Sequence, residues 1–179
     1  MLTFICSLVY NFFSATHMVE LGQDRKIAAL KSSMCVHFFL EVLFMYMRAA
    51  VSEAEKAFND GNVPVGAVIV RDGIIIARAH NTKNTSNIAV YHAEILCIID
   101  ACKYLNSWYL NECDIYVTLK PCAMCINALA EARVRNVFYL LDSNYDDNLS
   151  KNREYINFKN IVDDYEYSDM LKQFFLDKR

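Results

Sequence analysis

The chain has 179 residues, of which 55% are hydrophobic and 22% are charged, and its formal net charge at pH 7 is −3. This composition is that of one globular domain with a sizeable core, and it excludes an intrinsically disordered chain. Seven cysteines, an odd number with no secretory framework, favour a reducing compartment in which free thiolates bind metal, so we expect a cytoplasmic protein.

The first 44 residues differ from the remainder of the chain. The apolar run from Phe4 to Phe13 is too short to span a bilayer, and no Lys or Arg precedes Arg25, so the basic leader of a signal peptide is missing. Met45 and Met47 offer later starts of translation. We therefore treat residues 1–44 as an N-terminal extension of doubtful status, either a genuine extension or an overextended reading frame.

The next part of the chain predicts a helix followed by a β-hairpin. We expect the helix over residues 39–58, because residues 59–62, Asn-Asp-Gly-Asn, form a strong turn signal. Two apolar runs, 65–70 and 74–79, are separated by the turn 71–73, which contains Asp-Gly. This pattern predicts a hairpin of two buried strands.

The second half of the predicted domain alternates between helices and strands. A polar loop over 81–87 leads to a helix over 92–105. A strand over 115–119, a helix over 122–132 and a strand over 136–141 follow. Strands that alternate with helices imply a layered α/β sheet, in which functional residues lie at the strand-to-helix junctions.

Two short motifs open two of these helices and carry the chemistry. They are His-Ala-Glu at 92–94 and Pro-Cys-Ala-Met-Cys at 121–125. Zinc prefers tetrahedral nitrogen and sulfur ligands, and a hydrolytic zinc site takes three from the protein and leaves the fourth position to water. Cys122 and Cys125 are three residues apart, so they lie on one face of the first helical turn, where the helix start favours the thiolate form. With His92 they supply the three ligands.

Glu94 is the predicted proton shuttle of this site. Its position two residues after His92 lets the carboxylate lie beside a metal-bound water, whose pKa is near ~7, without being a ligand itself. One Glu can take a proton from water and later deliver it to a leaving group. Hydrolytic removal of ammonia from an aromatic ring needs those two steps, and the pattern H-x-E…P-C-x-x-C is typical of zinc-dependent nucleobase deaminases.

Other interpretations of the cysteines were weighed against the catalytic one. A lone Cys-x-x-Cys is more often a redox pair or half of a structural zinc site, and a closed structural site needs a fourth protein ligand. Cys97, Cys102 and Cys113 are available, but the first two lie in an apolar helical pattern that is typical of buried, inert cysteine. The accompanying His-x-Glu motif favours the catalytic site.

Around the two motifs the sequence resembles the bacterial tRNA-specific adenosine deaminases. The resemblance covers residues 45–179 and is carried by NVPVGAV at 62–68, Asn81, HAEI at 92–95 and YVTL at 116–119. It implies a zinc-dependent deaminase domain over 45–179 with a cytidine-deaminase-like fold, a three-layer α/β/α arrangement around a mixed central sheet. It also implies one zinc ion per subunit.

The resemblance implies the reaction and its partners as well. We expect hydrolytic deamination of adenosine to inosine at the wobble position (34) of tRNA. The enzyme is expected to be a homodimer that binds the tRNA anticodon loop. We expect no association with a membrane. Asn81 is implied to hydrogen-bond the flipped base, although by sequence alone it would more often be a loop-capping residue. One alternative is a deaminase of a free base, nucleoside or nucleotide, of guanine or cytosine type, with the same zinc site. The other is a noncatalytic zinc-stabilised binding module.

Three positions depart from the family pattern. Lys120 stands where the family usually has Glu, residues 88–91 replace Asp-Pro-Thr-Ala, and residues 142–148 replace a glycine-containing loop. We expect these changes to alter pocket shape and local charge. RNA binding also requires basic groups, which in a chain of net charge −3 must be assembled locally. The candidates are Lys83, Arg133, Arg135, Lys151, Arg153, Lys178 and Arg179.

Overall fold

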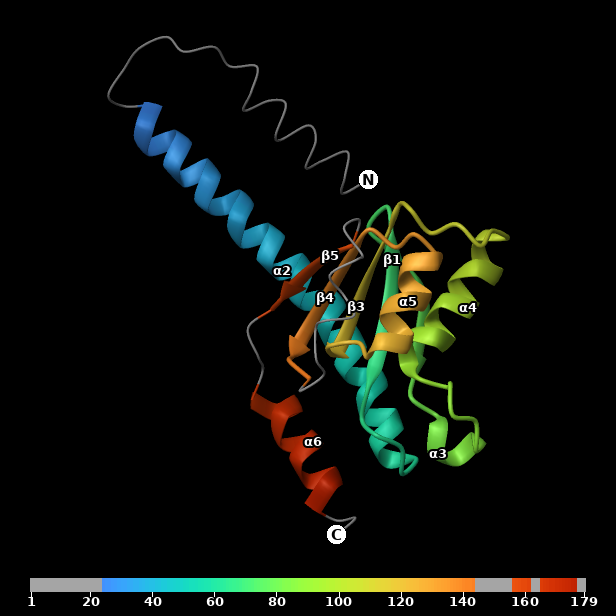
Figure 1. Ribbon diagram of the computed structural model, residues 1–179. Helices are drawn as coiled ribbons and strands as arrows, with labels where there is room; N and C mark the ends of the chain where they lie inside the picture. Colours follow the sequence, from blue (N-terminus) through green and yellow to red (C-terminus); the bar gives the residue numbers. More distant parts are fainter. Residues whose placement is uncertain (1–23, 144–155, 162–164, 177–179) are drawn as a thin grey trace. The chain divides into compact units, whose positions relative to one another are not determined.

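The computed structural model describes residues 24–143, 156–161 and 165–176 (Figure 1). The chain divides into two compact units, Met1–Met45 and Tyr46–Arg179. In the first unit, the described residues all belong to helix α2 (Asp24–Asn59), which continues into the second. Across the described part of the chain, every helix is too short or too polar to cross a membrane. The fold described below is that of the second unit.

Helix α2 ends where the sequence predicted, but it begins about fifteen residues earlier than the predicted start at residue 39. Residues 24–38 contain neither Gly nor Pro, and they include the strong helix formers Ala, Leu, Lys and Met. Nothing in that stretch interrupts a helix, so intrinsic propensity extends it towards the N-terminus.

Five strands form one mixed sheet in the order β2-β1-β3-β4-β5. β1 (Gly66–Arg71) pairs antiparallel with both β2 (Ile74–His80) and β3 (Cys113–Leu119). β3 pairs in parallel with β4 (Asn136–Leu141), which pairs in parallel with β5 (Asn157–Asn160). The predicted hairpin is confirmed, and its two turn residues have φ angles of 51° and 79°, as the Asp-Gly turn requires. Only β1 is buried as predicted, because β2 is an edge strand with partly exposed side chains.

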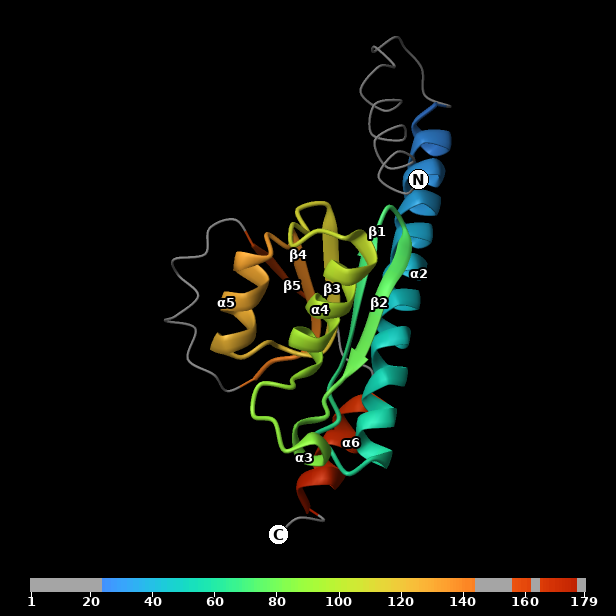
Figure 2. The same ribbon diagram turned by 90° about the vertical axis from the view of Figure 1, so that its right-hand side faces the viewer.

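Helices cover both faces of the sheet (Figures 1 and 2). α4 (Ala93–Leu105) and α5 (Ala123–Glu131) lie on one face, where residues such as Ile115 and Val117 of β3 join the main apolar core. On the other face Tyr116 of the same strand packs against Tyr46 of α2, at a ring-centroid distance of 5.1 Å. The predicted three-layer α/β/α fold is confirmed.

Gly66 marks the closest approach of α2 to the sheet. A Cβ atom built on this residue would lie 2.1 Å from the carbonyl oxygen of Ala50 and 2.4 Å from the amide nitrogen of Ala54. Real side-chain atoms do not approach so closely, so only glycine lets the helix pack directly on the start of β1.

Two elements near the C-terminus were not predicted. β5 has only four residues, three of which are polar, so it carries no hydrophobic alternation. α6 (Tyr165–Leu176) buries Tyr167 and Phe174, and the Phe174 ring lies 6.5 Å from that of Phe58 on α2. Its apolar spacing of three and four residues is a helical signal that the sequence does contain.

Candidate functional site

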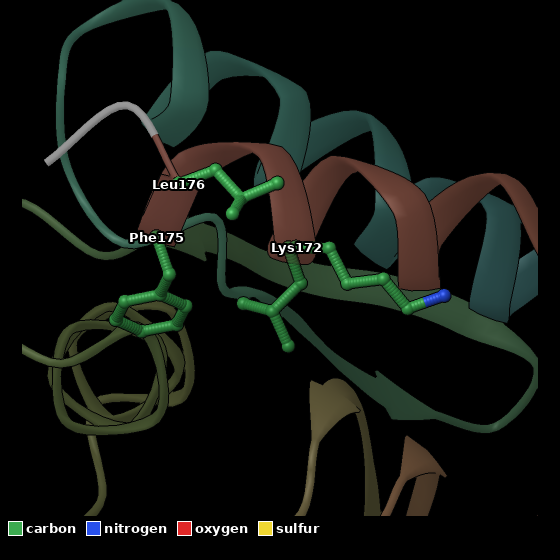
Figure 3. Close-up of a pocket in the computed structure, with 4 residues that line it drawn as sticks. Lys172, Phe175 and Leu176 are labelled. Carbon is green, nitrogen blue, oxygen red and sulfur yellow. The ribbon is translucent and has the colours of Figure 1, made fainter. Parts of the chain in front are cut away.

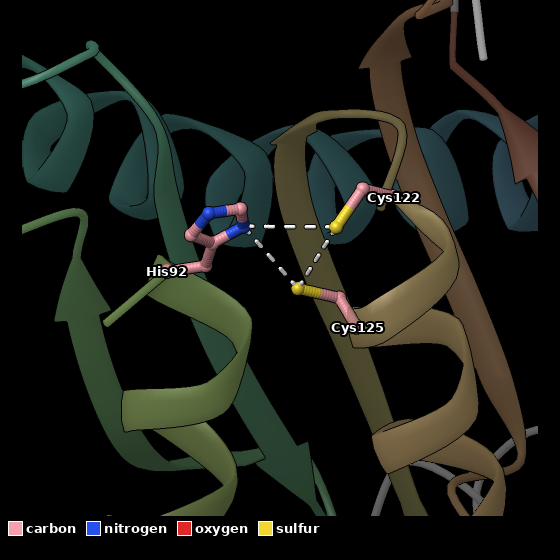
Figure 4. Close-up of side chains that lie close together, drawn as sticks. All are labelled: His92, Cys122 and Cys125. Atoms are coloured by element: carbon pink, nitrogen blue, oxygen red, sulfur yellow. Dashed lines mark hydrogen bonds between the residues drawn. The ribbon is translucent and has the colours of Figure 1, made fainter. Parts of the chain in front are cut away.

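The three predicted metal ligands lie together at one end of the sheet (Figure 4). Nδ1 of His92 is 3.7 Å from Sγ of Cys122 and 3.6 Å from Sγ of Cys125, and the two sulfur atoms are 3.7 Å apart. Figure 4 shows the imidazole reaching the cluster from α4 and the two thiols reaching it from the start of α5. Two motifs about thirty residues apart in the sequence therefore form one cluster.

The spacing of these atoms fits a tetrahedral metal ion. A zinc ion with Zn–N of about 2.0 Å and Zn–S of about 2.3 Å places two sulfur ligands about 3.8 Å apart, and a nitrogen and a sulfur about 3.5 Å apart. The three observed separations, 3.6, 3.7 and 3.7 Å, agree with both values. Among the described residues, no further His, Cys, Asp or Glu joins the cluster. It therefore offers three donors, as a catalytic metal site does, rather than the four of a structural one.

Both motifs place a ligand at a helix N-cap. His92 precedes α4 with φ −79° and ψ 154°, and Cys122 precedes α5 with φ −72° and ψ 169°. An N-cap side chain commonly bonds to the first helical N–H groups, but neither of these two does so. Their donor atoms are turned to the cluster instead, where the positive ends of two helix dipoles favour negative charge.

The electrostatics of the cluster separate its two thiols. The hydrogen bond between the two sulfur atoms lowers the pKa of Cys122 to about 4. The same hydrogen bond, together with burial, raises the pKa of Cys125. Hydrogen bonding to Cys122 raises the pKa of His92. Each of the three donor groups therefore has its pKa shifted by another member of the cluster.

Glu94 lies beside the cluster but outside its set of donor atoms. Its side chain is buried in the first turn of α4, and burial raises the pKa of its carboxyl to about 7. A hydrogen bond joins it to the side chain of Cys125. This hydrogen bond offsets part of the cost of burying the carboxyl and places Glu94 next to the predicted metal ligands.

The three other described cysteines that were considered as ligands stand apart from the cluster. Cys97 is fully buried in the core, where its Sγ lies 3.6 Å from the carbonyl oxygen of Ala67, and burial raises its thiol pKa. Burial also raises the pKa of Cys102, and that of Cys113 to about 11. Their thiols therefore stay protonated, so they behave as packing groups.

Asn81 follows β2 and folds back on its own loop. Its backbone N–H donates to the carbonyl of Val65, and its side-chain Oδ1 accepts a hydrogen bond from the N–H of Lys83 at 2.9 Å. This is the loop-capping role that the sequence alone favoured for Asn81. Its side-chain Nδ2 makes no hydrogen bond within the described residues, so a donor is left on this side chain.

Asn62 is a structural residue of the site that sequence reasoning missed. It is fully buried behind the loop that the sequence predicted over residues 81–87, which contains the short helix α3 (Lys83–Ser86). Its Oδ1 accepts hydrogen bonds from the N–H groups of Asn84 and Thr85, and its Nδ2 donates to Thr85 Oγ1. Directly before this helix, the Thr82 N–H donates to the carbonyl of Tyr91, which closes the loop just before His92.

The departures from the family pattern take different positions. Ile88 and Val90 expose apolar side chains directly before His92, and residues 144–148 of the predicted variant loop lie outside the described residues. Lys120 pairs with Asp142, with Nζ and Oδ1 3.0 Å apart. Among the basic candidates for RNA contact, Arg135 is held by Asp114 through two hydrogen bonds. Lys151, Arg153, Lys178 and Arg179 lie outside the described residues.

A hollow of about 450 Å³ lies on α6, away from these groups (Figure 3). Leu171, Lys172, Phe175 and Leu176 line it. Three of these four side chains are apolar, and Nζ of Lys172 pairs with Oδ1 of Asp169 at 3.0 Å. None of the predicted site residues lines this hollow, and the candidate metal site of the described residues is the cluster of His92, Cys122 and Cys125.

A three-layer α/β/α sheet that holds three metal donors at two helix starts, with a buried carboxyl beside them, defines a class of deaminase enzymes with a cytidine-deaminase-like fold. The family model of the MafB19-like deaminases matches residues 43–179, so the chain belongs to that family. A tRNA-specific adenosine deaminase of Bacillus subtilis (strain 168) is 48% identical over 95 residues. That match covers 53% of this chain and 59% of the relative's own length.

Two solved structures are similar over a larger share of the chain. One comes from biochemical and structural studies of A-to-I editing by tRNA:A34 deaminases at the wobble position of transfer RNA, with 32% identity and a TM-score of 0.60. The match covers 65% of this chain and 98% of that one. The other is a guanine deaminase from Bacillus subtilis, with 32% identity, a TM-score of 0.53, and coverage of 72% and 91%.

Proposed function

We propose that this protein is a zinc-dependent hydrolase that deaminates adenosine to inosine at the wobble position (34) of tRNA. The observation that carries the proposal is the buried carboxyl of Glu94 next to a cluster of three metal donors with tetrahedral spacing. A noncatalytic zinc-stabilised module would have no use for a buried acid at that place, and keeping it buried is costly.

The residues of the cluster divide the work. His92, Cys122 and Cys125 would hold one zinc ion per subunit, which when bound supplies a Lewis acid that makes water nucleophilic at neutral pH. Glu94 takes a proton from the attacking water and gives one to the departing amino group. The burial of Glu94 keeps competing solvent away from this transfer.

Asn81 is the proposed contact to the substrate base. Its Oδ1 is occupied by the N–H of Lys83, which fixes the side chain and leaves the Nδ2 donor for a base acceptor. The exposed apolar residues before His92 would border the same entrance. A base must be flipped out of its stack to reach such a site, which costs least in a single-stranded anticodon loop.

The remaining expectations belong to the same proposal. We propose that residues 45–179 form the deaminase domain, that residues 1–44 are an extension to it, and that the protein works in the cytoplasm as a homodimer on the tRNA anticodon loop. The family match over residues 43–179 and the relative from Bacillus subtilis support this assignment.

A free-base deaminase is the second candidate, because the similarity to the guanine deaminase structure equals that to the A34 deaminase structure in sequence identity. The same zinc site and Glu94 would serve both reactions. The two candidates differ in the size of the substrate and in what lies around the flipped base.

One experiment separates them. The purified full chain, loaded with zinc, is incubated with an anticodon stem-loop RNA that carries adenosine at position 34, and in parallel with guanine, cytosine and their nucleosides. We expect inosine in the RNA and no ammonia from the free compounds. A matched RNA with guanosine at position 34 is the control. Release of ammonia from guanine together with an unchanged RNA would support the second candidate and contradict the first.

A further inference from the structure

Lys120 lies directly before the Pro-Cys motif, and the structure gives it a defined partner. Its Nζ lies 3.0 Å from Oδ1 of Asp142, and it stands 5.9 Å from the centre of the Tyr139 ring. The Lys120 side chain is only 11% exposed, whereas that of Asp142 is 63% exposed. A nearly buried ammonium group needs a compensating charge, and Asp142 supplies one.

The pair joins the carboxyl ends of two parallel strands. Leu119 of β3 is in register with Leu141 of β4, and the N–H of Lys120 donates to the Leu141 carbonyl at 2.9 Å. Lys120 directly follows the last residue of β3, and Asp142 directly follows the last residue of β4. The ion pair therefore adds a contact between side chains one residue beyond the last paired residues of the two strands.

This strand end is connected to the metal cluster by one rigid residue. Pro121 alone separates Lys120 from Cys122, and its ring fixes φ, so the link has little freedom to absorb a shift of the strand end. Cys122 follows as the N-cap of α5.

We propose that Lys120 and Asp142 are positioning residues that hold Cys122 in place and thereby set the affinity and geometry of the metal site. This inference rests on the proposed function, because it takes His92, Cys122 and Cys125 as the ligands. It assigns to Lys120 a structural coupling to the metal instead of a contact to the RNA, since its charge is directed at Asp142.

The test uses Lys120→Met and Asp142→Asn in the full chain, alone and combined. Zinc affinity is measured by competition with a chromophoric chelator, and site geometry by the visible absorption of the cobalt-substituted protein. We expect each single variant to bind zinc about 10-fold more weakly, which is the low end of the effect of residues that orient metal ligands. The double variant should be no weaker than the weaker single one, because both remove the same interaction.

A matched pair elsewhere in the chain serves as the control. Lys103 and Asp100 form a similar contact, with Nζ and Oδ1 3.1 Å apart, on the exposed side of α4. Lys103→Met and Asp100→Asn should leave zinc affinity and the cobalt spectrum unchanged. Lys120→Arg, which keeps the charge, should retain most of the wild-type affinity, and Asp142→Asn alters an exposed side chain that the core does not need for folding.

Three results would count against the proposal. Zinc affinities of the Lys120 and Asp142 variants that equal those of the control pair would overturn it while leaving the proposed function intact. Fully additive losses in the double variant would show that the two residues act separately, which also overturns it. A wild-type chain that binds no zinc would contradict the proposed function and this inference together.

Discussion

The two helix starts that carry the metal donors reach the cluster in different ways. α4 begins after a segment of twelve residues that follows β2, and this segment is folded around one buried amide, Asn62. α5 begins directly after β3, with Pro121 and an ion pair at the strand end. His92 therefore follows a loop that is held by uncharged long-range hydrogen bonds, whereas Cys122 and Cys125 follow a short segment with a proline and an ion pair.

The largest effect is expected when a metal ligand is removed from α5. Cys125→Ser takes a thiolate from the cluster, so we expect loss of stoichiometric zinc and of deamination. A ligand that binds only the folded protein stabilises it by about 2.7 kcal/mol at a concentration 100 times its Kd. Added zinc should therefore raise the Tm of the wild type and leave that of the variant unchanged, as measured by thermal unfolding with and without a chelator. A variant that still retains one zinc per chain would remove Cys125 from the ligand set.

The second change acts on the side of α4. Glu94→Gln keeps the shape of the side chain but removes the group that accepts and donates the proton, so turnover should fall by about 10³-fold. Zinc content should stay at the wild-type level, because Glu94 is not one of the donor atoms.

The measurement is single-turnover inosine formation, with zinc quantified in the same samples. Turnover within tenfold of the wild type would show that another group moves the proton.

The third change tests whether the loop between β2 and α4 supports His92. Asn62→Ala removes the acceptor for two backbone N–H groups and a donor to Thr85, so the free energy of unfolding should fall by about 2 kcal/mol. Because this loop leads to His92, zinc affinity should fall as well. Thr85→Val is the matched control, since it keeps both backbone bonds and should cost about 1 kcal/mol or less. Chemical denaturation measures the free energy of unfolding of both variants. Equal losses of unfolding free energy in the two variants would contradict a central role for the side-chain Oδ1 of Asn62.

The smallest expected effect belongs to Asn81. Asn81→Ala removes the proposed hydrogen bond to the base and the cap on Lys83, so kcat/KM for the RNA should fall about 10-fold while zinc affinity stays the same. Steady-state kinetics on the anticodon stem-loop, together with the chelator assay, tests both parts. A loss of zinc in this variant would mean that Asn81 acts by supporting the loop and not by binding the base.

Part of this site could be predicted from residues close together in the sequence. The spacing of Cys122 and Cys125 and the two-residue spacing of His92 and Glu94 reflect the geometry of single helix starts, so the pattern alone was enough. The Asp-Gly hairpin was predictable for the same reason, because a two-residue turn is decided by the φ angles that its own residues tolerate.

The remainder depends on residues that are distant in sequence. Nothing near Asn62 in the sequence indicates that its side-chain amide would hydrogen-bond to a loop twenty residues later. Residue 66 must be glycine only because α2 packs against it and leaves no room for a side chain. The ion pair of Lys120 and Asp142 appears only once β3 and β4 are parallel neighbours in register. β5 was missed because a short polar edge strand owes its structure to its neighbour in the sheet.

The sequence by itself therefore determined the type of chemistry: one imidazole, two thiols and a carboxyl at two helix starts. Only the tertiary structure decided that the two starts meet, with three donor atoms 3.6 to 3.7 Å apart. The physical reason is that local spacing sets which side chains share a helical turn. The distance between two turns is set by how strands pair and how helices pack on them, which involves contacts throughout the sheet.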